Sequence, residues 1–327
     1  MISADQPRAP HSRERLQRRP AQRRPNQRLL SQGRPNQRLR LLALALPALL
    51  LVAGCTATDS DTDASTPTPT PTGSISSSLT ISAPYLPLPT GVGVDYQLGG
   101  GYTPADGVEI VARDSTDSAA EGLYSICYIN AFQTQPQEAD LWLTERADLL
   151  LRDDNGDPVI DPGWPDEMIL DISTTKNRIT IASIFGETIL RCASDGFKAV
   201  EFDNLDTWTR TDGSLTEQNS VEMAMALVDL THSAGLAAGQ KNSAELGERG
   251  RDEVGFDFAV TEECAQFNEC DVFRDVYKDA VIDIEYTDAL DRPFDEICAD
   301  PATPDMTVLR DRDLVTPDSD EYVFEHC

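Results

Sequence analysis

The stretch Ala199-Val200-Glu201-Phe202-Asp203-Asn204-Leu205-Asp206 joins a short β-prone run to an acidic end. Side chains of a strand alternate between its two faces, so Ala199, Glu201 and Asp203 share one face and the apolar residues between them share the other. Two carboxylates on one buried face are costly unless they are paired or used. The stretch therefore predicts a strand that ends in a polar site, although Asp203-Asn204 could simply cap a following helix.

Short apolar runs of the same kind recur from residue 91 to the end of the chain. The candidate strands are Val94–Leu98, Val108–Ala112, Tyr124–Ile129, Met168–Ile172, Ala199–Phe202, Ala237–Gln240, Phe258–Thr261, Val281–Glu285 and Thr307–Leu309. Between them, residues 174–193 and 216–234 carry apolar side chains at helical spacing. Strands that alternate with helices, without a glycine-rich dinucleotide fingerprint, predict an α/β fold, a (β/α)8 TIM-type barrel in one domain. A doubly wound parallel sheet is the alternative.

Polar residues follow several of these strands, as in Gln240-Lys241-Asn242, Thr261-Glu262-Glu263 and Glu285-Tyr286. The carboxyl ends of barrel strands meet at the active-site face, so these side chains predict a polar funnel there.

The residues and motifs that other catalytic mechanisms require are few or absent in this sequence. After Cys55 the chain has two histidines, His232 and His326, and it has neither a Gly-x-Ser-x-Gly elbow nor a phosphate loop. Hydrolysis by a pair of carboxylates requires none of these and no cofactor. A metal-dependent enzyme that uses the same carboxylates is a further alternative.

Charge divides the chain unevenly. The formal net charge is −29, yet residues 1–40 hold eleven arginines and only two acidic residues, and from Thr56 onward 16 basic residues face 54 acidic ones, a net of −38. Such a domain repels nucleic acid and anionic lipid and would suit a cationic ligand. The simpler explanation is solubility, since many secreted proteins are acidic.

The beginning of the chain predicts export. An apolar run from Leu41 to Ala53 is too short to span a membrane comfortably but fits a signal-peptide core. It ends in Leu51-Val52-Ala53-Gly54-Cys55, which resembles a bacterial lipobox in which Cys55 is acylated. The following Thr/Pro/Ser-rich residues cannot build a core. We therefore expect a leader and signal peptide at 1–54, a lipidated linker at 55–90 and the folded domain at 91–327, held on the outer face of the cell membrane by its lipid.

Six cysteines remain besides Cys55, and an even number in an exported chain predicts three disulfides. They are Cys127, Cys192, Cys264, Cys270, Cys298 and Cys327. Of the fifteen possible pairings, we expect Cys264 with Cys270, which are near neighbours in the chain, and then Cys127 with Cys192 and Cys298 with Cys327. A zinc site is the competing interpretation, but the chain has no Cys-x-x-Cys pair.

Seven further segments of the folded part form a recognisable set: Asp95-Tyr96-Gln97-Leu98, Ile126-Cys127-Tyr128, Leu170-Asp171-Ile172, Asp195-Gly196-Phe197 with Val200 to Asp206, Lys241-Asn242, Ala259 to Cys264 with Asn268-Glu269-Cys270, and Glu285-Tyr286. On these segments, the sequence from about Val94 to Cys327 resembles glycoside hydrolase family 114, the endo-α-1,4-polygalactosaminidase-like barrels. The loop after Tyr128 departs from the Trp-Arg-Pro-Asp stretch of many members, which leaves substrate choice within the family open.

The resemblance implies that Asp203 and Glu262 are the catalytic pair. Strict alternation along Ala259-Val260-Thr261 would instead point Glu263 inward, so Glu263 is kept as a reserve. The residues expected to contact substrate are Asp95, Tyr96, Asp114, Tyr128, Asp171, Glu201, Asn204, Asp206, Lys241, Asn242, Glu263, Glu285 and Arg310. Tyr96, Trp164 and Trp208 could stack on sugar rings or equally belong to the core.

The expected function is hydrolysis of an α-1,4-linked galactosamine or N-acetylgalactosamine polymer. The alternatives are hydrolysis of another exopolysaccharide and a non-catalytic carbohydrate-binding lipoprotein on the same barrel. We expect a monomer with a polysaccharide partner, no nucleic acid partner, and membrane contact only through the lipid.

Overall fold

The strands of the barrel form one sheet in chain order. The computed structural model describes residues 85–327. Eight neighbouring strands run parallel and a short ninth runs antiparallel to the eighth. Their bounds are β1 (Gly93–Gln97), β2 (Val108–Asp114), β3 (Tyr124–Asn130), β4 (Ala199–Asp203), β5 (Ala237–Lys241), β6 (Phe258–Glu262), β7 (Val281–Tyr286), β8 (Met306–Arg310) and β9 (Phe324–His326). The arrangement confirms the predicted (β/α)8 TIM-type barrel rather than a doubly wound sheet.

The barrel interior is filled by alternate residues of the strands. The inner cluster includes Val94 and Tyr96 of β1, Ala199 of β4 and Phe258 of β6. Val200 and Phe202 belong to the outer cluster instead, as period-two alternation predicts. Gly239 on β5 leaves room for Phe258, because a Cβ atom there would lie 2.5 Å from the Phe258 ring.

The barrel closes through a side chain between its first and eighth strands. β9 occupies the edge of β8 that would pair with β1 in an ideal eight-stranded barrel. Arg310 of β8 crosses this seam, donating to the main-chain oxygen of Tyr96 and pairing with Asp95 at 3.2 Å. Both charged groups are fully buried, so the pair is a buried polar link across the seam.

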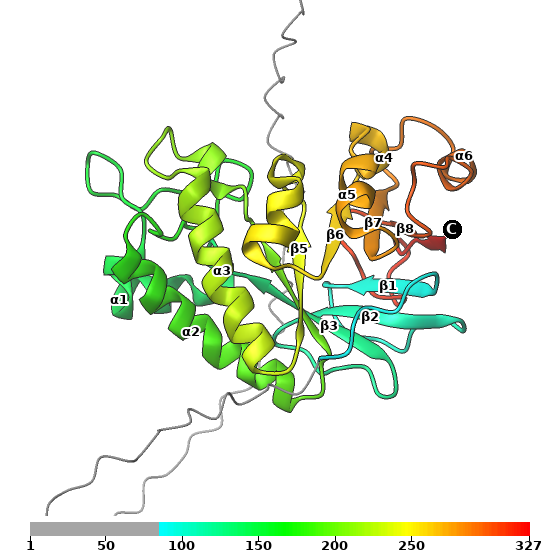
Figure 1. Ribbon diagram of the computed structural model, residues 1–327, viewed down its shortest axis with the longest axis horizontal. Coiled ribbons are helices and arrows are strands. Elements are labelled where there is room, and N and C mark those ends of the chain that lie inside the picture. The colour runs from blue at the N-terminus through cyan, green and yellow to red at the C-terminus, as the bar shows by residue number, and fades with distance from the viewer. Residues whose placement is uncertain (1–84) are drawn as a thin grey trace, which may run out of the picture. The chain divides into compact units, whose positions relative to one another are not determined.

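The helices are distributed unevenly around the barrel. Their bounds are α1 (Ala139–Glu145), α2 (Thr175–Ser194), α3 (Glu217–Ser233), α4 (Cys264–Phe267), α5 (Cys270–Tyr277) and α6 (Phe294–Cys298), with short turns η1 (Pro136–Glu138), η2 (Ala147–Leu149), η3 (Thr207–Arg210), η4 (Ala244–Leu246) and η5 (Gly250–Val254). The long helices α2 and α3 pack side by side along one flank, while α4, α5 and α6 lie beyond β6 and β7 (Figure 1). In the described part of the chain, the connections after β1 and β2 contain no helix.

Local sequence explains the two long helices. The side chains of Thr174 and Thr216 each accept the main-chain N–H three residues ahead, which satisfies a free donor at the helix start. Asn219 completes a capping box by bonding back to the Thr216 backbone. Both helices therefore begin where the sequence predicts.

One predicted strand is wrong. Met168–Ile172 makes only isolated antiparallel bridges, to Ile160, Gln133 and Leu150, within the long β3–β4 connection. Its apolar side chains are buried in the outer cluster, so the run packs onto the barrel without joining the sheet. The three-residue β9 was not predicted, because it is too short for a period-two pattern.

All three expected disulfides are present: Cys127–Cys192, Cys264–Cys270 and Cys298–Cys327. The first ties β3 to α2, the second closes the turn between α4 and α5, and the third fastens the chain end to α6.

The folded domain begins before the predicted boundary at residue 91. Leu88 is buried in the inner cluster, and the Tyr85 ring stacks on His232 while its hydroxyl donates to Asp257 at 2.5 Å. The predicted leader, signal peptide, lipidated Cys55 and most of the linker lie outside the described residues. Within residues 85–327, none of the helices has the length and apolar character needed to cross a membrane.

Candidate active site

Lys241 lies at the centre of a carboxylate cluster at the carboxyl ends of the strands. Its Nζ is 3.2 Å from Glu201 Oε1 and 3.7 Å from one carboxylate oxygen each of Asp203 and Glu262. Asp203, Lys241 and Glu262 are the last residues of β4, β5 and β6, three adjacent strands. The lysine and Glu201 side chains are fully buried, whereas those of Asp203 and Glu262 keep 12% and 6% exposure. The two carboxylates that retain contact with solvent are the predicted catalytic pair.

Three tyrosines each hold one carboxylate. The hydroxyl of Tyr96 donates to Glu201 at 2.7 Å and accepts from Lys241 Nζ at 3.0 Å. Tyr128 donates to Asp203 at 2.6 Å, and Tyr286 donates to Glu262 at 2.5 Å. Each carboxylate therefore has a fixed orientation.

The charges in the cluster are strongly coupled. Burial alone would lower the pKa of Lys241, but Asp203, Glu262 and Glu201 together hold that pKa well above its usual value. Burial raises the pKa of Glu201 even though Lys241 and Tyr96 act in the opposite direction. Lys241 is therefore a permanent cation at neutral pH, placed where it stabilises negative charge on both Asp203 and Glu262.

The residue after each of these strand ends has a left-handed backbone. The φ angles are 66° at Asn204, 49° at Asn242 and 60° at Glu263. Asparagine tolerates this region better than most residues. Asn242 also holds the neighbouring acid, since its Nδ2 donates to Glu262 Oε2 at 3.2 Å and its Oδ1 accepts the Glu262 N–H at 2.8 Å.

A polar rim extends from Asp203 toward the β3–β4 connection. Asn204 donates to Asn130 at 2.9 Å, and Asn130 donates to Glu167 at 3.0 Å. Arg210 pairs with Asp206 at 2.8 Å and with the buried Asp161 at 2.7 Å. Of this rim, the sequence predicted Asn204 and Asp206 but missed Asn130 at the end of β3, Arg210 in η3, and Asp161 and Glu167 in the irregular β3–β4 connection.

Four of the predicted substrate-contacting residues have structural partners elsewhere. Asp95 and Arg310 pair with each other at the barrel seam. Asp114 accepts from Thr116 within its own loop and from Gln135, and Asp171 accepts from Ser173 and Asn177 beside the start of α2. The structure does not bring any of these four into the cluster around Lys241.

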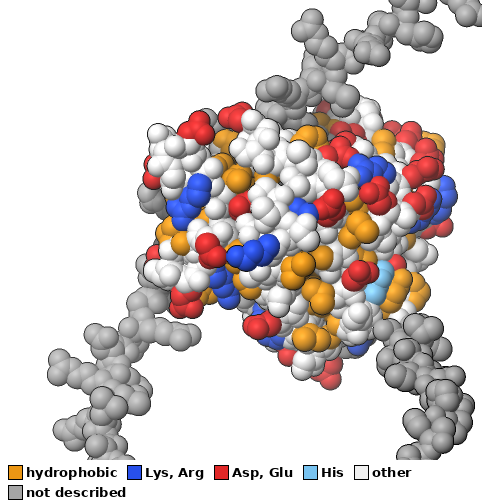
Figure 2. Space-filling view, turned by 60° about the vertical axis from the view of Figure 1, so that its left-hand side comes forward, with side chains coloured by type: hydrophobic (Ala, Val, Ile, Leu, Met, Phe, Trp, Pro, Cys, Tyr) orange, Lys and Arg blue, Asp and Glu red, His pale blue; other side chains and the backbone are white. Residues whose placement is uncertain are grey.

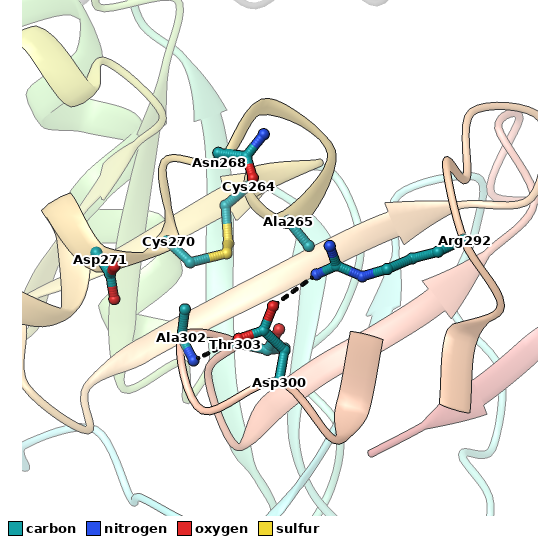
Figure 3. A pocket seen from close by; sticks show the side chains of 9 residues that line it. All are labelled: Cys264, Ala265, Asn268, Cys270, Asp271, Arg292, Asp300, Ala302 and Thr303. Carbon is teal, nitrogen blue, oxygen red and sulfur yellow. Dashed lines mark hydrogen bonds and ion pairs between the residues drawn. A yellow bond between two sulfur atoms is a disulfide. The ribbon is translucent and has the colours of Figure 1, made fainter. Parts of the chain in front are cut away.

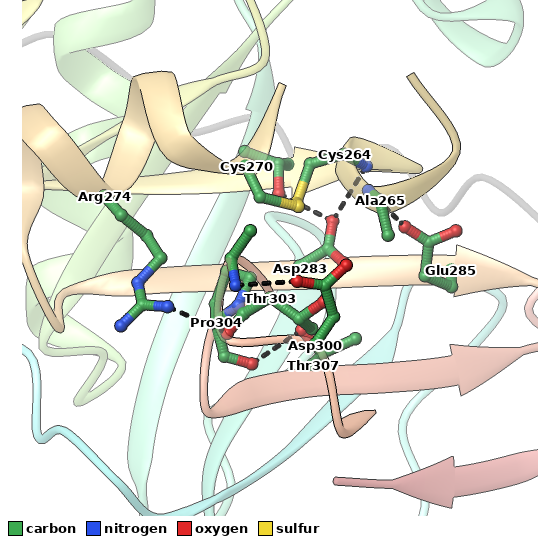
Figure 4. Close-up of a disulfide and its surroundings, with 12 residues drawn as sticks. Cys264, Ala265, Cys270, Arg274, Asp283, Glu285, Asp300, Thr303, Pro304 and Thr307 are labelled. Carbon is green, nitrogen blue, oxygen red and sulfur yellow. Dashed lines mark hydrogen bonds between the residues drawn. A yellow bond between two sulfur atoms is a disulfide. The ribbon is translucent and has the colours of Figure 1, made fainter. Parts of the chain in front are cut away.

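Glu263 and Glu285 lie behind their strands rather than in the barrel mouth. On β6, Phe258 and Val260 face inward with Glu262, so the expectation that alternation points Glu263 inward is wrong. Asp283 and Glu285 of β7 face outward, where they accept the N–H groups of Cys264 at 3.2 Å and Ala265 at 2.8 Å (Figure 4). Burial and the nearby Asp283 carboxylate raise the pKa of Glu285 to about 9, so it is protonated at neutral pH.

A small hollow lies beside the Cys264–Cys270 disulfide (Figure 3). It is lined by Cys264, Ala265, Asn268, Cys270, Asp271, Arg292, Asp300, Ala302 and Thr303. None of the groups that surround Lys241 contributes to it. Cys264, Cys270 and Asp283 lie close enough together to resemble a set of metal ligands. The two sulfur atoms are joined in the Cys264–Cys270 disulfide, so neither is a free thiolate.

Two residues in contact with the cluster were not predicted as site residues. Tyr286 holds Glu262, and its inward direction follows from alternation with Ile282 and Ile284. Arg312 lies over the Tyr286 ring with its guanidinium carbon 4.1 Å from the ring centroid. It follows β8 in a loop, so no periodic pattern marked it.

The partly buried Trp208 packs against the outer core cluster, and Trp164 lies in the β3–β4 connection between Asp161 and Glu167.

The arrangement fits carboxylate-pair hydrolysis. The Asp203 and Glu262 oxygens nearest Lys241 each lie 3.7 Å from its Nζ, so they are separated by at most twice that distance. Glycosidases place their two carboxyl groups about 5–5.5 Å apart for retention and about 6.5–9.5 Å apart for inversion. The two oxygens are therefore closer together than the widest separations of the inverting range.

Comparison with known proteins identifies the family to which the chain belongs. A comparison with curated proteins found no match. The fold is similar to the crystal structure of Aspergillus fumigatus Ega3 in complex with galactosamine, with 22% identity, a TM-score of 0.59, and coverage of 76% of this chain and 100% of that one. It is also similar to the glycoside hydrolase domain of Pseudomonas aeruginosa PelA, with 12% identity, a TM-score of 0.45, and coverage of 71% and 97%. Residues 76–327 match the model of glycoside-hydrolase family GH114, which is most of the chain, so this protein belongs to that family and is a glycosidase.

Proposed function

We propose that this glycosidase hydrolyses a polymer of α-1,4-linked galactosamine, partly N-acetylated, with Asp203 as nucleophile and Glu262 as general acid and then base. The observation that carries the proposal is the position of Asp203 and Glu262 on either side of one buried lysine at the barrel mouth. Both keep some solvent contact, and each is oriented by its own tyrosine.

The roles follow from the environments of the two carboxylates. Asp203 accepts from Tyr128 and from the Asn204 N–H at 2.7 Å, and it lies near Lys241. Donors and a cation stabilise the ionised form that a nucleophile requires. Glu262 accepts from Tyr286 and Asn242, which fix the direction in which it delivers a proton.

The first step forms a bond between Asp203 and the anomeric carbon while Glu262 protonates the leaving oxygen. In the second step Glu262 takes a proton from water, and the water oxygen displaces Asp203 from the anomeric carbon. Lys241, whose pKa the neighbouring carboxylates hold well above its usual value, stabilises the Asp203 carboxylate before the first step and as it leaves in the second.

Charge supports an amino-sugar polymer. Residues 85–327 hold 16 basic and 51 acidic side chains, a net charge of −35. On the face in Figure 2, basic side chains stand among acidic ones rather than in a continuous basic surface. A polymer with free amines is cationic at neutral pH, so the field of the protein would speed its encounter with the barrel mouth.

The test compares partly deacetylated, fully N-acetylated and neutral glucan polymers by release of reducing ends. We expect the partly deacetylated polymer to be cleaved fastest, and this advantage to shrink between about 10 mM and 1 M salt, where the screening length falls from about 30 Å to about 3 Å. Faster cleavage of the acetylated or neutral polymer, independent of salt, would favour another exopolysaccharide.

We further propose that the enzyme is exported and anchored by a lipid on Cys55, because the residues before this cysteine resemble a lipobox. In a bacterial host the wild-type protein is then expected in the membrane fraction and Cys55→Ser in the soluble fraction. A Cys127→Ser variant serves as a control for a cysteine outside the motif. Equal partition of the wild type and Cys55→Ser would contradict the anchor.

A further inference from the structure

We propose that Arg312 and Glu263 are positioning residues for Glu262, and that the ion pair between buried Glu263 and partly buried Arg312 holds the catalytic acid in its working direction. The inference rests on the proposed function, because Glu262 is the proton donor only there. Glu263 follows β6 and Arg312 follows β8, and each acts on the Glu262 carboxylate through another group.

The first observation is the backbone of Glu263. It has a φ angle of 60°, as the residues after Asp203 and Lys241 also have positive φ angles. The other two positions hold asparagine, which adopts this conformation at low cost, whereas glutamate does so rarely. A glutamate placed here suggests that its side chain has a use that offsets the backbone strain.

The second observation is the partner of that side chain. Glu263 is 2% exposed and forms an ion pair with Arg312, at 2.5 Å between Arg312 Nη2 and Glu263 Oε1. Arg312 is fixed in turn by Asp288, at 2.7 Å from Nη2 and 3.0 Å from Nε. The turn that follows Glu262 is therefore anchored to the loop after β8.

The third observation is the second route from Arg312 to the acid. The guanidinium lies over the Tyr286 ring at 4.1 Å from its centroid, and the Tyr286 hydroxyl donates to Glu262 Oε1 at 2.5 Å. A guanidinium on an aromatic face restricts the ring. One arginine thus holds both the main chain next to Glu262 and the hydroxyl that orients its carboxylate.

The fourth observation is that the same turn is tied from behind. The N–H of Glu263 donates to the Ile284 oxygen at 2.8 Å, and the next two N–H groups bind Asp283 and Glu285 (Figure 4). These bonds do not involve the ion pair, so we expect the turn to stay folded when the pair is removed, which allows positioning to be separated from stability.

The test is Glu263→Asn, with the partly deacetylated galactosamine polymer as substrate. Asparagine suits the backbone but cannot reach Arg312. We expect Tm to be unchanged or higher, kcat to fall roughly 10- to 100-fold, and KM to change little, since misplacement of a catalytic group by about 1 Å can cost 100-fold. Unchanged kcat in the folded variant would overturn the proposal.

Arg312→Lys and Arg312→Gln provide the second arm. Lysine keeps the positive charge but cannot stack a planar group on Tyr286 or donate to two partners as a guanidinium does. The kcat of Arg312→Lys should therefore lie between that of the wild type and that of Arg312→Gln. Arg292→Lys is the matched control, because Arg292 pairs with Asp300 on the far side of the disulfide, and it should retain full activity. Equal kcat for wild type, Arg312→Lys and Arg312→Gln would contradict a positioning role.

A crystal structure of Glu263→Asn keeps this test independent of the substrate. If the wild type fails to cleave the polymer, the proposed substrate fails while the positioning proposal is still decided. Displacement of the Glu262 carboxylate from the Tyr286 hydroxyl in the variant supports it, and an unmoved carboxylate overturns it.

Discussion

Replacing Asp203 by asparagine is expected to lower kcat on the polymer by roughly 1,000-fold or more, because the amide cannot form the glycosyl–enzyme bond. Asparagine preserves shape and can still accept from the Tyr128 hydroxyl. The fold should therefore be intact, which near-ultraviolet circular dichroism checks.

Glu262→Gln removes the proton donor and should reduce kcat on the polymer by a similar factor. Its signature differs from that of Asp203→Asn, because an aryl glycoside with a good leaving group needs little protonation. On such a substrate the first step of Glu262→Gln should be largely retained, whereas Asp203→Asn should remain inactive. Steady-state and burst kinetics on both substrates distinguish the two roles.

Glu285→Gln is the matched control for both variants. Glu285 is a buried carboxyl on an adjacent strand, it faces outward, and it is protonated at neutral pH, so the amide is nearly isosteric with it. Its kcat should stay near the wild-type value. A loss in Glu285→Gln as large as in Asp203→Asn would contradict the assignment of the pair.

Replacing Lys241 by methionine is expected to lower the free energy of unfolding by about 3–5 kcal/mol at neutral pH, because it leaves buried carboxylates without their cation. The volume is nearly conserved, so the loss is electrostatic. The folded pKa of Lys241 lies above its unfolded value, so its contribution is complete at neutral pH and is lost only as pH rises through the folded pKa.

Acid should rescue Lys241→Met in part. As pH falls and Glu201 becomes neutral, the cost of the missing cation decreases. Because burial raises the pKa of Glu201, the difference from wild type should narrow as pH falls through that raised pKa. Urea unfolding at several pH values measures this difference. Lys176→Met, at an exposed position on α2, is the control and should change stability by less than about 0.5 kcal/mol. A Lys241→Met protein as stable as wild type at pH 7 would refute the electrostatic explanation.

The barrel was predictable because buried parallel strands leave short apolar runs that tertiary context does not override. Eight of the nine candidate strands match the sheet. Met168–Ile172 was wrongly predicted as a strand because a loop segment that is buried is also apolar, and its sequence then resembles that of a buried strand. The same limit explains why the helix-free connections after β1 and β2 could not be recognised: a missing helix leaves no pattern.

Within the site, prediction was reliable where alternation was anchored correctly. On β4 the inward direction of Glu201 and Asp203 followed from the flanking Val200 and Phe202. On β6, alternation was counted from Ala259 and Thr261 as inward residues, yet Phe258 fills the barrel because Gly239 on the neighbouring strand makes space for it. A small residue that makes room for a large one on the neighbouring strand can be recognised only when it is known which strands are paired.

The partners of charged residues were also beyond the sequence. Asp95 lies within β1 and Arg310 ends β8, and they pair with each other across the seam. Arg312 lies near Glu262 only because the loop after β8 folds back over Tyr286. Charges at strand ends therefore mark the active-site face, but which of them meet is decided by loop geometry.

The central claim is that Asp203 and Glu262 hydrolyse the polymer by double displacement, and proton NMR during the reaction tests it most directly. Fresh reducing ends from partly deacetylated α-1,4-galactosamine polymer are followed before mutarotation. We predict that α-anomeric signals appear first with wild type, and that none appear with Asp203→Asn. Signals of the β-anomer first, or no new reducing ends from folded wild-type protein, would contradict the account.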